Sequence, residues 1–207
     1  MSAGDPITRM FDGLASRIDA AGYRTVGFTS ALLGEGVSTI ALGTAVSLAT
    51  LRQETVLLVD ANWLQPTLTG DAHLDGDPGL AECLAEKSEL HRVLRPASRA
   101  RVAFLPVGDR SVARPALRGL SSFLLGVAPT FETVVVDLPP ILAGESFVLP
   151  WLALLDQVVI VLRELATPAP VLRQALERLG TASPHVVVNR AMQPAVDVAA
   201  ALRTVRA

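Results

Sequence analysis

Residues 25–42 read TVGFTSALLGEGVSTIAL, in which a β-branched run precedes a glycine-bearing loop and then an apolar stretch that starts near Ser38. Gly34 and Gly36 can adopt backbone angles that turn successive N–H groups toward one point. A helix starting there would add partial positive charge, and the Ser38 hydroxyl could bind magnesium. We therefore predict an anion-binding loop with the contact residues Gly34, Glu35, Gly36, Val37, Ser38 and Thr39. The alternative is a glycine-rich turn in which Ser38 or Thr39 caps the helix.

Val37 stands where a phosphate-binding loop of the pattern GxxxxGK[ST] has a lysine that reaches the β- and γ-phosphates. The segment from Phe28 to Thr39 contains no cation, and Lys87 is the only lysine of the chain. A charge-assisted contact contributes roughly 1.5–3 kcal/mol to binding, and loss of a group that stabilises a transition state costs about 10²–10³ in rate. The sequence predicts weak or lost nucleotide binding, unless an arginine or another subunit supplies the charge.

Two further segments, VLLVDANW and VVVDLPP, each end an apolar run with an aspartate, Asp60 and Asp137. In a parallel sheet these carboxylates would lie near the glycine-bearing loop, where one can hold magnesium and the other can order a nucleophile. The alternative is that each aspartate caps the turn that follows its strand. Three such loops in this order favour the phosphate-binding interpretation.

Short β-branched runs alternate with longer stretches of helical period along the chain. The expected strands are Thr25–Thr29, Val56–Asp60, Val102–Pro106, Thr133–Asp137, Gln157–Leu162 and His185–Asn189. The expected helices are Phe11–Ala21, Val37–Leu51, Gly79–Ala85, Pro115–Gly126, Ser146–Leu154 and Pro168–Leu179, with a final helix after Asn189. This pattern predicts one α/β domain over residues 1–207, with a doubly wound, mostly parallel sheet flanked by helices and ligands at the carboxyl ends of the strands.

Composition excludes several classes of protein. Half of the 207 residues are hydrophobic and 18% are charged, which is unlike disordered or coiled-coil sequences. The net charge of −2 provides no basic field, so we expect no nucleic-acid partner. The single cysteine, Cys83, favours a reducing compartment. The chain shows neither a secretory signal nor an apolar run long enough for a bilayer, which predicts a cytoplasmic protein that meets the membrane only through a partner.

The motifs, taken in order, resemble the bacterial tyrosine kinases of capsule and exopolysaccharide export, within the MinD/ParA-like P-loop ATPases. The markers run over nearly the whole chain: GEGVST, VLLVDAN followed by Pro66, DPGLAECLAE, FLPVG, VVVDLPP, VVIVLRELATP and VVVNR. The resemblance implies a P-loop NTPase fold with ATP or ADP and Mg²⁺ as cofactors. It also implies that the glycine loop and Ser38 bind phosphates and the metal.

The resemblance assigns roles to three residues beyond that loop. Asp60 matches the first aspartate of the Walker A′ motif, which helps to activate the substrate tyrosine, and is the candidate catalytic residue. Asp137 matches the Walker B aspartate, so that Ser38, Asp60 and Asp137 form the candidate metal set. Asn189, at the end of the last strand, matches a position that contacts adenine.

Departures from the family pattern fall at its charged positions. Val37 replaces the Walker A lysine, so this motif is degenerate. Asn62 and Leu64 replace the second aspartate and the arginine of the A′ motif DxDxR, and Leu138 replaces a small hydroxyl residue of Walker B. These changes remove charge from the site that would transfer phosphate.

Two more family features are altered outside the site. The assembly motif ExxRxxR matches Arg9, Asp12 and Ala15 here, although the apolar spacing of its helix is kept. Tyr23 is the only tyrosine, so the chain has no cluster of tyrosines to phosphorylate.

These features favour a pseudokinase-like accessory protein of exopolysaccharide or capsule biosynthesis or export. Its expected partner is a membrane polysaccharide co-polymerase or export protein, which would bring it to the inner membrane, and self-association into a homo-oligomer is left open. One alternative is an active tyrosine kinase or ATPase that uses a cation supplied in trans. Another is a ParA/MinD-like positioning ATPase.

Overall fold

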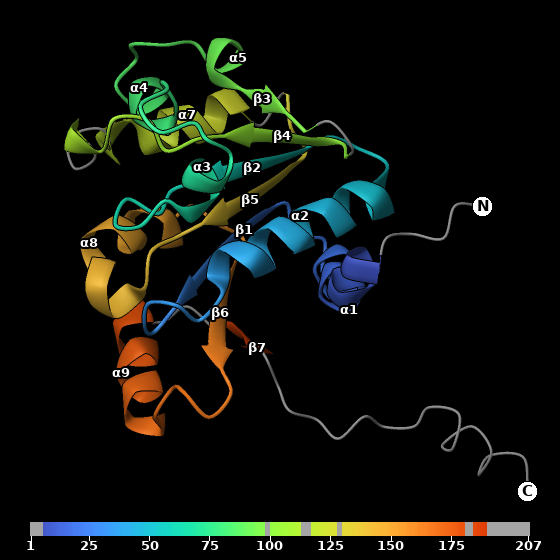
Figure 1. Ribbon diagram of the computed structural model, residues 1–207, viewed down its shortest axis with the longest axis vertical. Helices are drawn as coiled ribbons and strands as arrows, with labels where there is room; N and C mark the ends of the chain where they lie inside the picture. The colour runs from blue at the N-terminus through green and yellow to red at the C-terminus, as the bar shows by residue number, and fades with distance from the viewer. Residues whose placement is uncertain (1–5, 98–99, 113–116, 128–129, 181–183, 190–207) are drawn as a thin grey trace, which may run out of the picture.

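The protein is described by a computed structural model over residues 6–97, 100–112, 117–127, 130–180 and 184–189 (Figure 1). Its helices are α1 (Pro6–Ala20), α2 (Val37–Arg52), α3 (Thr67–Asp71), α4 (Leu80–Leu84), α5 (Leu90–Val93), α7 (Leu120–Val127), α8 (Ile141–Leu152) and α9 (Ala169–Leu179), with 3₁₀ turns η1 (Arg110–Val112) and η2 (Leu117–Gly119). Its strands are β1 (Thr25–Ser30), β2 (Val56–Asp60), β3 (Arg95–Pro96), β4 (Val102–Leu105), β5 (Thr133–Asp137), β6 (Gln157–Arg163) and β7 (His185–Asn189).

These strands form one sheet in the order β3-β4-β2-β5-β1-β6-β7. All neighbouring pairs are parallel except β3 with β4. Residues of β2, β5 and β1 are buried on both faces because helices cover both sides. One core contains side chains of α1, α2 and α3, and the other contains side chains of α4, α7, α8 and α9. The predicted doubly wound α/β class is confirmed.

The first two helices lie together on one face of the sheet, with α2 running along the strands in Figure 1. Phe11 and Ile18 form the buried stripe of α1, and the ring of Phe11 lies against Gly43 of α2, where a Cβ would overlap it. The helix expected over Phe11–Ala21 is therefore present, but it begins earlier than expected, at Pro6, and ends at Ala20. Of the altered assembly positions, Asp12 is exposed and Ala15 is buried, and the side chain of Arg9 lies outside the described residues.

Element boundaries agree best for the strands. The ranges predicted for β2, β5 and β7 are confirmed, and β1, β4 and β6 differ by one residue. Helix α8 begins at Ile141 instead of the expected Ser146, because Pro140 precedes its first turn, a position that tolerates proline. Its last turn contains Pro150, and Gly144 interrupts its helical backbone angles.

The short elements were not predicted. Helices α3 and α5 and the two-residue strand β3 have too few residues to show a period. The helix expected over Pro115–Gly126 is divided here into η2 and α7, and its first residues lie outside the described ranges, as does the helix expected after Asn189.

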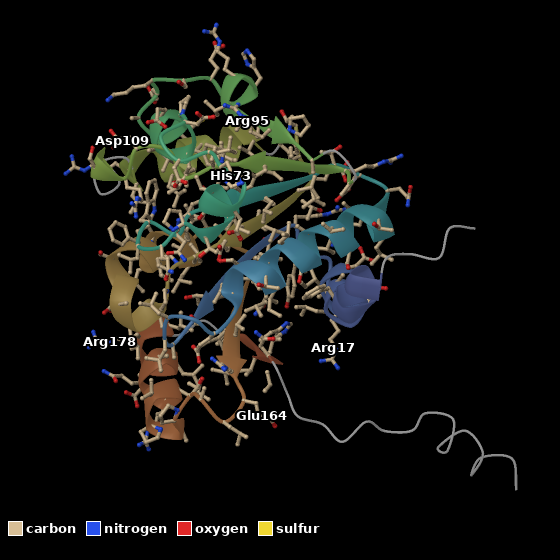
Figure 2. All side chains as sticks on the ribbon, viewed as in Figure 1. Arg17, His73, Arg95, Asp109, Glu164 and Arg178 are labelled. Atoms are coloured by element: carbon tan, nitrogen blue, oxygen red, sulfur yellow. The ribbon has the colours of Figure 1, made fainter. Side chains whose placement is uncertain are left out.

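The charged side chains of Arg17, Asp109 and Arg178 lie at the periphery of the molecule (Figure 2). Of the helices within the described ranges, none is both long and apolar enough to cross a bilayer.

Candidate functional site

The glycine loop, residues 30–39, connects the carboxyl end of β1 to the start of α2. Gly34 and Gly36 have φ angles of 79° and 89°, in the left-handed region where glycine avoids the steric cost of a Cβ. Helix α2 starts immediately afterwards at Val37, and no side chain caps it. Its first N–H groups are therefore available to an anion, as the sequence predicted.

A pocket of about 190 Å³ opens at this loop. It is lined by Ser30, Leu33, Gly34, Glu35, Gly36, Val37, Ser38 and Thr39 on the loop side and by Asn62, Gln65, Thr67, Leu138 and Pro140 on the other. Sites for small organic ligands usually measure about 300–1,000 Å³. The pocket therefore has room for phosphate groups more readily than for a whole nucleotide.

Val37 occupies the lysine position as a core residue. Its side chain is only 8% exposed and packs into the core that contains α1 and α2. Lysine and arginine are absent from the described lining of the pocket, in which Glu35 is the charged residue. The pocket is thus closed in part by a hydrocarbon group where the phosphate-binding motif has a cation.

Glu35 and Asn189 are held against the loop itself. Glu35 is buried, and its carboxylate accepts a hydrogen bond from the backbone N–H of Leu32 (2.9 Å). The Asn189 amide donates to the backbone carbonyl of Glu35 (2.8 Å), and a Cβ at Gly36 would overlap that amide. The structure places Asn189 beside the loop but not among the pocket residues, and its contact with adenine stays a prediction.

Asp60 and Asp137 are brought side by side below the loop. They are register partners on the adjacent parallel strands β2 and β5, and both are fully buried. Burial raises the pKa of Asp60 to about 6, although hydrogen bonds to its carboxylate oppose the rise. Those bonds come from the N–H (2.9 Å) and the hydroxyl (2.8 Å) of Thr69 and from the N–H of Asn62 (3.1 Å).

Asp137 has no comparable support. Burial, and next the negative charge of Asp60, raise its pKa well above the usual range. Neither carboxylate oxygen has a hydrogen-bond partner of ordinary geometry among the described residues, although the nearby Ser38 hydroxyl partly offsets the rise in pKa. An unpartnered buried carboxylate beside a hydroxyl is a chemically suitable place for a cation.

A metal at this point would need ligands in addition to the two carboxylates. In the described part of the chain, no three His, Cys, Asp or Glu side chains group closely enough to hold an ion. Ser38 is the protein hydroxyl on the same side, so the remaining ligands would be phosphate or water oxygens, as is usual for magnesium. The candidate set Ser38, Asp60 and Asp137 is therefore assembled in space, and its occupancy stays a prediction.

One cation near the site was not found from the sequence. Arg110, in η1, donates to the backbone carbonyl of Leu64 (3.3 Å), and its charge slightly lowers the pKa of Asp60. Leu64 is the position where the A′ motif has its arginine. Arg110 comes from a different loop 46 residues along the chain, and its position follows no motif spacing, so the tertiary fold alone reveals it.

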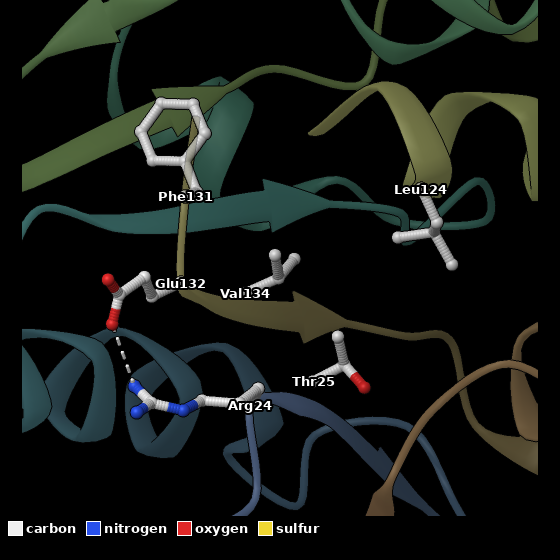
Figure 3. Close-up of a pocket in the computed structure, with 6 residues that line it drawn as sticks. All are labelled: Arg24, Thr25, Leu124, Phe131, Glu132 and Val134. Carbon is white, nitrogen blue, oxygen red and sulfur yellow. Dashed lines mark ion pairs between the residues drawn. The ribbon is translucent and has the colours of Figure 1, made fainter. Parts of the chain in front are cut away.

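A second hollow, of about 340 Å³, lies at the opposite edge of the sheet (Figure 3). It is lined by Arg24, Thr25, Leu124, Phe131, Glu132 and Val134. Arg24 is paired with Glu132 (3.4 Å), and Thr25 accepts a hydrogen bond from the Asp156 N–H (2.9 Å). Because its polar groups are already engaged, we place the functional site at the glycine loop despite the smaller volume there.

The sheet order, the glycine loop before α2 and the strand-end aspartates define a P-loop NTPase-like protein. No family model matches the chain. It is 28% identical over 123 residues to the tyrosine-protein kinase YwqD of Bacillus subtilis (strain 168), a match that covers 58% of this chain and 52% of the relative. The chain thus spans about half the length of that curated relative.

Solved structures show the same similarity to bacterial tyrosine kinases. The kinase domain of VpsO superposes with a TM-score of 0.79 at 25% identity, over 89% of this chain and 93% of that one. The septum site-determining protein MinD of Pyrococcus horikoshii, solved with Mg-ADP, shares the fold with a TM-score of 0.62 at 19% identity, over 79% and 67% of the two chains. These comparisons confirm the resemblance to bacterial tyrosine kinases and to MinD-like P-loop ATPases.

Proposed function

We propose that this chain is a kinase-like accessory protein of exopolysaccharide or capsule assembly whose phosphoryl-transfer chemistry is impaired. The observation that carries this proposal is Val37, a buried valine at the start of α2 in a pocket whose described lining contains Glu35 and no cation. The β- and γ-phosphates of a nucleotide would meet a hydrocarbon surface there, with no counter-charge from the described lining.

The phosphate-binding roles that we propose follow the geometry of the loop. Backbone N–H groups from Gly34 to Thr39 would form the cradle, and the Ser38 hydroxyl with Asp137 and Asp60 would hold magnesium. A bound magnesium ion would neutralise part of the charge that accumulates on the phosphates. Asp60, the carboxylate with the pKa of about 6, is the candidate base toward a hydroxyl nucleophile. Nucleotide binding is weak because the backbone cradle acts without the lysine.

We further propose that residues 1–207 form one domain that works in the cytoplasm at the inner membrane. A membrane polysaccharide co-polymerase or export protein would bring it there. The support for this partner is the resemblance to bacterial tyrosine kinases. Affinity purification of the tagged chain from solubilised membranes should recover a polysaccharide co-polymerase or exporter, and repeated purification without either would count against the assignment.

A second candidate function is an active kinase or ATPase with a relocated cation. The retained pair Asp60 and Asp137 favours it, as does Arg110, whose charge reaches Asp60 from η1. In this candidate, Arg110 or an arginine of another copy would take part of the role of the missing lysine. The ParA/MinD-like alternative has no specific observation of this kind in its favour.

Turnover of ATP by the purified chain separates the two candidates. We expect no phosphate release above background from the wild type at any protein concentration, a gain for Val37→Lys, and loss of that gain in Val37→Lys with Asp60→Ala. Val37→Met, which is long and uncharged, is the matched control and should stay inactive. Wild-type turnover that rises with protein concentration and is abolished by Asp60→Ala would establish the active candidate instead.

A further inference from the structure

Glu35 has an unusual position for a charged residue of a phosphate-binding loop. Its side chain is 3% exposed, and its carboxylate is turned toward the chain and satisfied by it. Oxygen Oε2 accepts the N–H of Leu32 within the loop (2.9 Å). Oxygen Oε1 accepts the hydroxyl of Thr167, in the turn between β6 and α9, and lies 3.4 Å from the backbone nitrogen of Arg163, the last residue of β6.

The turn that Glu35 contacts is itself strained. Leu165 has a φ of 59° although it is not glycine, and its side chain is 91% exposed, so packing does not compensate the left-handed backbone. Such a conformation persists when neighbouring contacts hold it. Main-chain bonds supply part of this support, because the N–H groups of Ala166 and Thr167 both donate to the Arg163 carbonyl (3.2 Å each). The Thr167 hydroxyl adds to it, because it donates to Glu35 and accepts from the Arg163 N–H (3.3 Å).

The loop is also fixed from a third strand. Asn189 at the end of β7 donates to the Glu35 carbonyl, and its backbone carbonyl accepts the N–H of Glu164 in the same turn (3.1 Å). Glu35 is therefore bonded through both its main chain and its side chain to segments that are more than 120 residues away in sequence. The arrangement connects the ends of β1, β6 and β7.

We propose that Glu35 is a positioning residue whose carboxylate latches the glycine loop to the turn at residues 163–167, so that this turn sets the shape of the loop. The latch acts without a nucleotide, because every bond in it is made by the chain. The chain lacks the lysine through which a bound phosphate would order the loop. The latch explains how the loop nevertheless keeps its cradle conformation. If a partner or a substitution displaces the turn, the latch transmits the displacement and the shape of the loop changes.

Amide hydrogen exchange of the full chain, measured without nucleotide, tests the latch. Thr167→Val removes the hydroxyl and keeps the shape of the side chain, so exchange within residues 30–39 should rise about tenfold, the factor expected for loss of a charge-assisted hydrogen bond. Thr167→Ser keeps the hydroxyl and should restore wild-type exchange in the loop. A rise confined to residues 163–168, or no rise, would overturn the proposal.

Glu35→Gln provides an independent test from the other side of the bond. A glutamine replaces one acceptor oxygen by an NH₂ group. In one orientation it loses the N–H of Leu32, and in the other it loses the N–H of Arg163 and reverses the bond to the Thr167 hydroxyl, so loop exchange should again rise. If both residues act through one latch, the double variant should exchange no faster than the faster single variant. Fully multiplicative effects would show that the two side chains act separately. Since nucleotide is absent, a failure of the proposed nucleotide site leaves this result unaffected.

Discussion

The two edges of the sheet, at the amino and the carboxyl ends of its strands, differ in whether their buried charged side chains have partners. At the amino ends of the strands, Arg52 is almost fully buried, pairs with Asp19 (2.8 Å) and donates to the Tyr23 carbonyl (2.9 Å). Arg24 next to it pairs with Glu54 (3.4 Å). At the carboxyl ends, Asp60 and Asp137 face one another across adjacent strands, and Asp137 lacks a hydrogen-bond partner of ordinary geometry among the described residues.

This difference separates residues that stabilise the fold from residues that destabilise it. A buried charge with partners holds elements together, whereas a buried carboxylate without a counter-charge costs free energy. A chain without any use for a ligand at the carboxyl edge would gain stability by neutralising Asp137. The presence of Asp137 beside Ser38 is the reason that we propose a cation site there, even though the lysine position is lost.

The largest effect is expected at the amino edge, from Arg52→Ala. The variant removes the donors to Asp19, Thr133 and the Tyr23 carbonyl. Because Asp19 is 43% exposed and can be solvated, the loss comes mainly from the buried hydrogen bonds, and the free energy of unfolding should fall by about 2–3 kcal/mol. Urea unfolding measures this, with Arg52→Lys as a control that should recover part of the loss. A change below about 0.5 kcal/mol, the usual size for a surface substitution, would show that the partnered arginine at the amino edge does not stabilise the fold more than a surface residue does.

A gain in stability is expected at the carboxyl edge, from Asp137→Asn. Because burial raises the pKa of Asp137 in the folded state, its ionised form destabilises the fold as pH rises above the ordinary aspartate range. At pH 8 the variant should be more stable than wild type by about 1–2 kcal/mol, and at pH 4, where the carboxyl is protonated in the folded state, this difference should disappear.

Asp60→Asn is the matched control for that gain. The wild-type Asp60 also has a raised folded pKa, of about 6, so its contribution to stability falls as pH rises from about 4 through 6. Its oxygens nevertheless accept three hydrogen bonds, from Thr69 and Asn62, and an amide cannot accept all of them. Asp60→Asn should therefore give no gain at pH 8. Equal stabilisation by both variants would show that hydrogen bonding does not distinguish the two aspartates.

The smallest effect is expected outside both edges, from Arg178→Ala. Arg178 pairs with Glu145 at 2.9 Å, yet about half of its side chain is exposed. Exposed ion pairs contribute about 0.2–1 kcal/mol, so thermal unfolding should shift only slightly. A loss as large as that of Arg52→Ala would mean that burial is not what separates these arginines.

The features of the fold and of the site that could be predicted are those marked within a short segment of the sequence. The ranges of β2, β5 and β7 were predicted correctly because their short β-branched runs end at aspartate or asparagine, and the parallel sheet then brings Asp60 beside Asp137. The bond between Glu35 and Thr167 joins residues 132 positions apart. Neither composition nor spacing marks such a pair, and the same holds for Arg110 beside the A′ loop.

Calorimetric titration with Mg-ATP of the wild type, Val37→Lys and Val37→Met tests the central claim most directly. The account predicts weak or undetectable binding by the wild type and by Val37→Met, and an affinity at least about tenfold higher for Val37→Lys, the least that a charge-assisted phosphate contact would add. Tight binding by the wild type that is not improved by the lysine would contradict it, since the terminal phosphates would then be held by other groups.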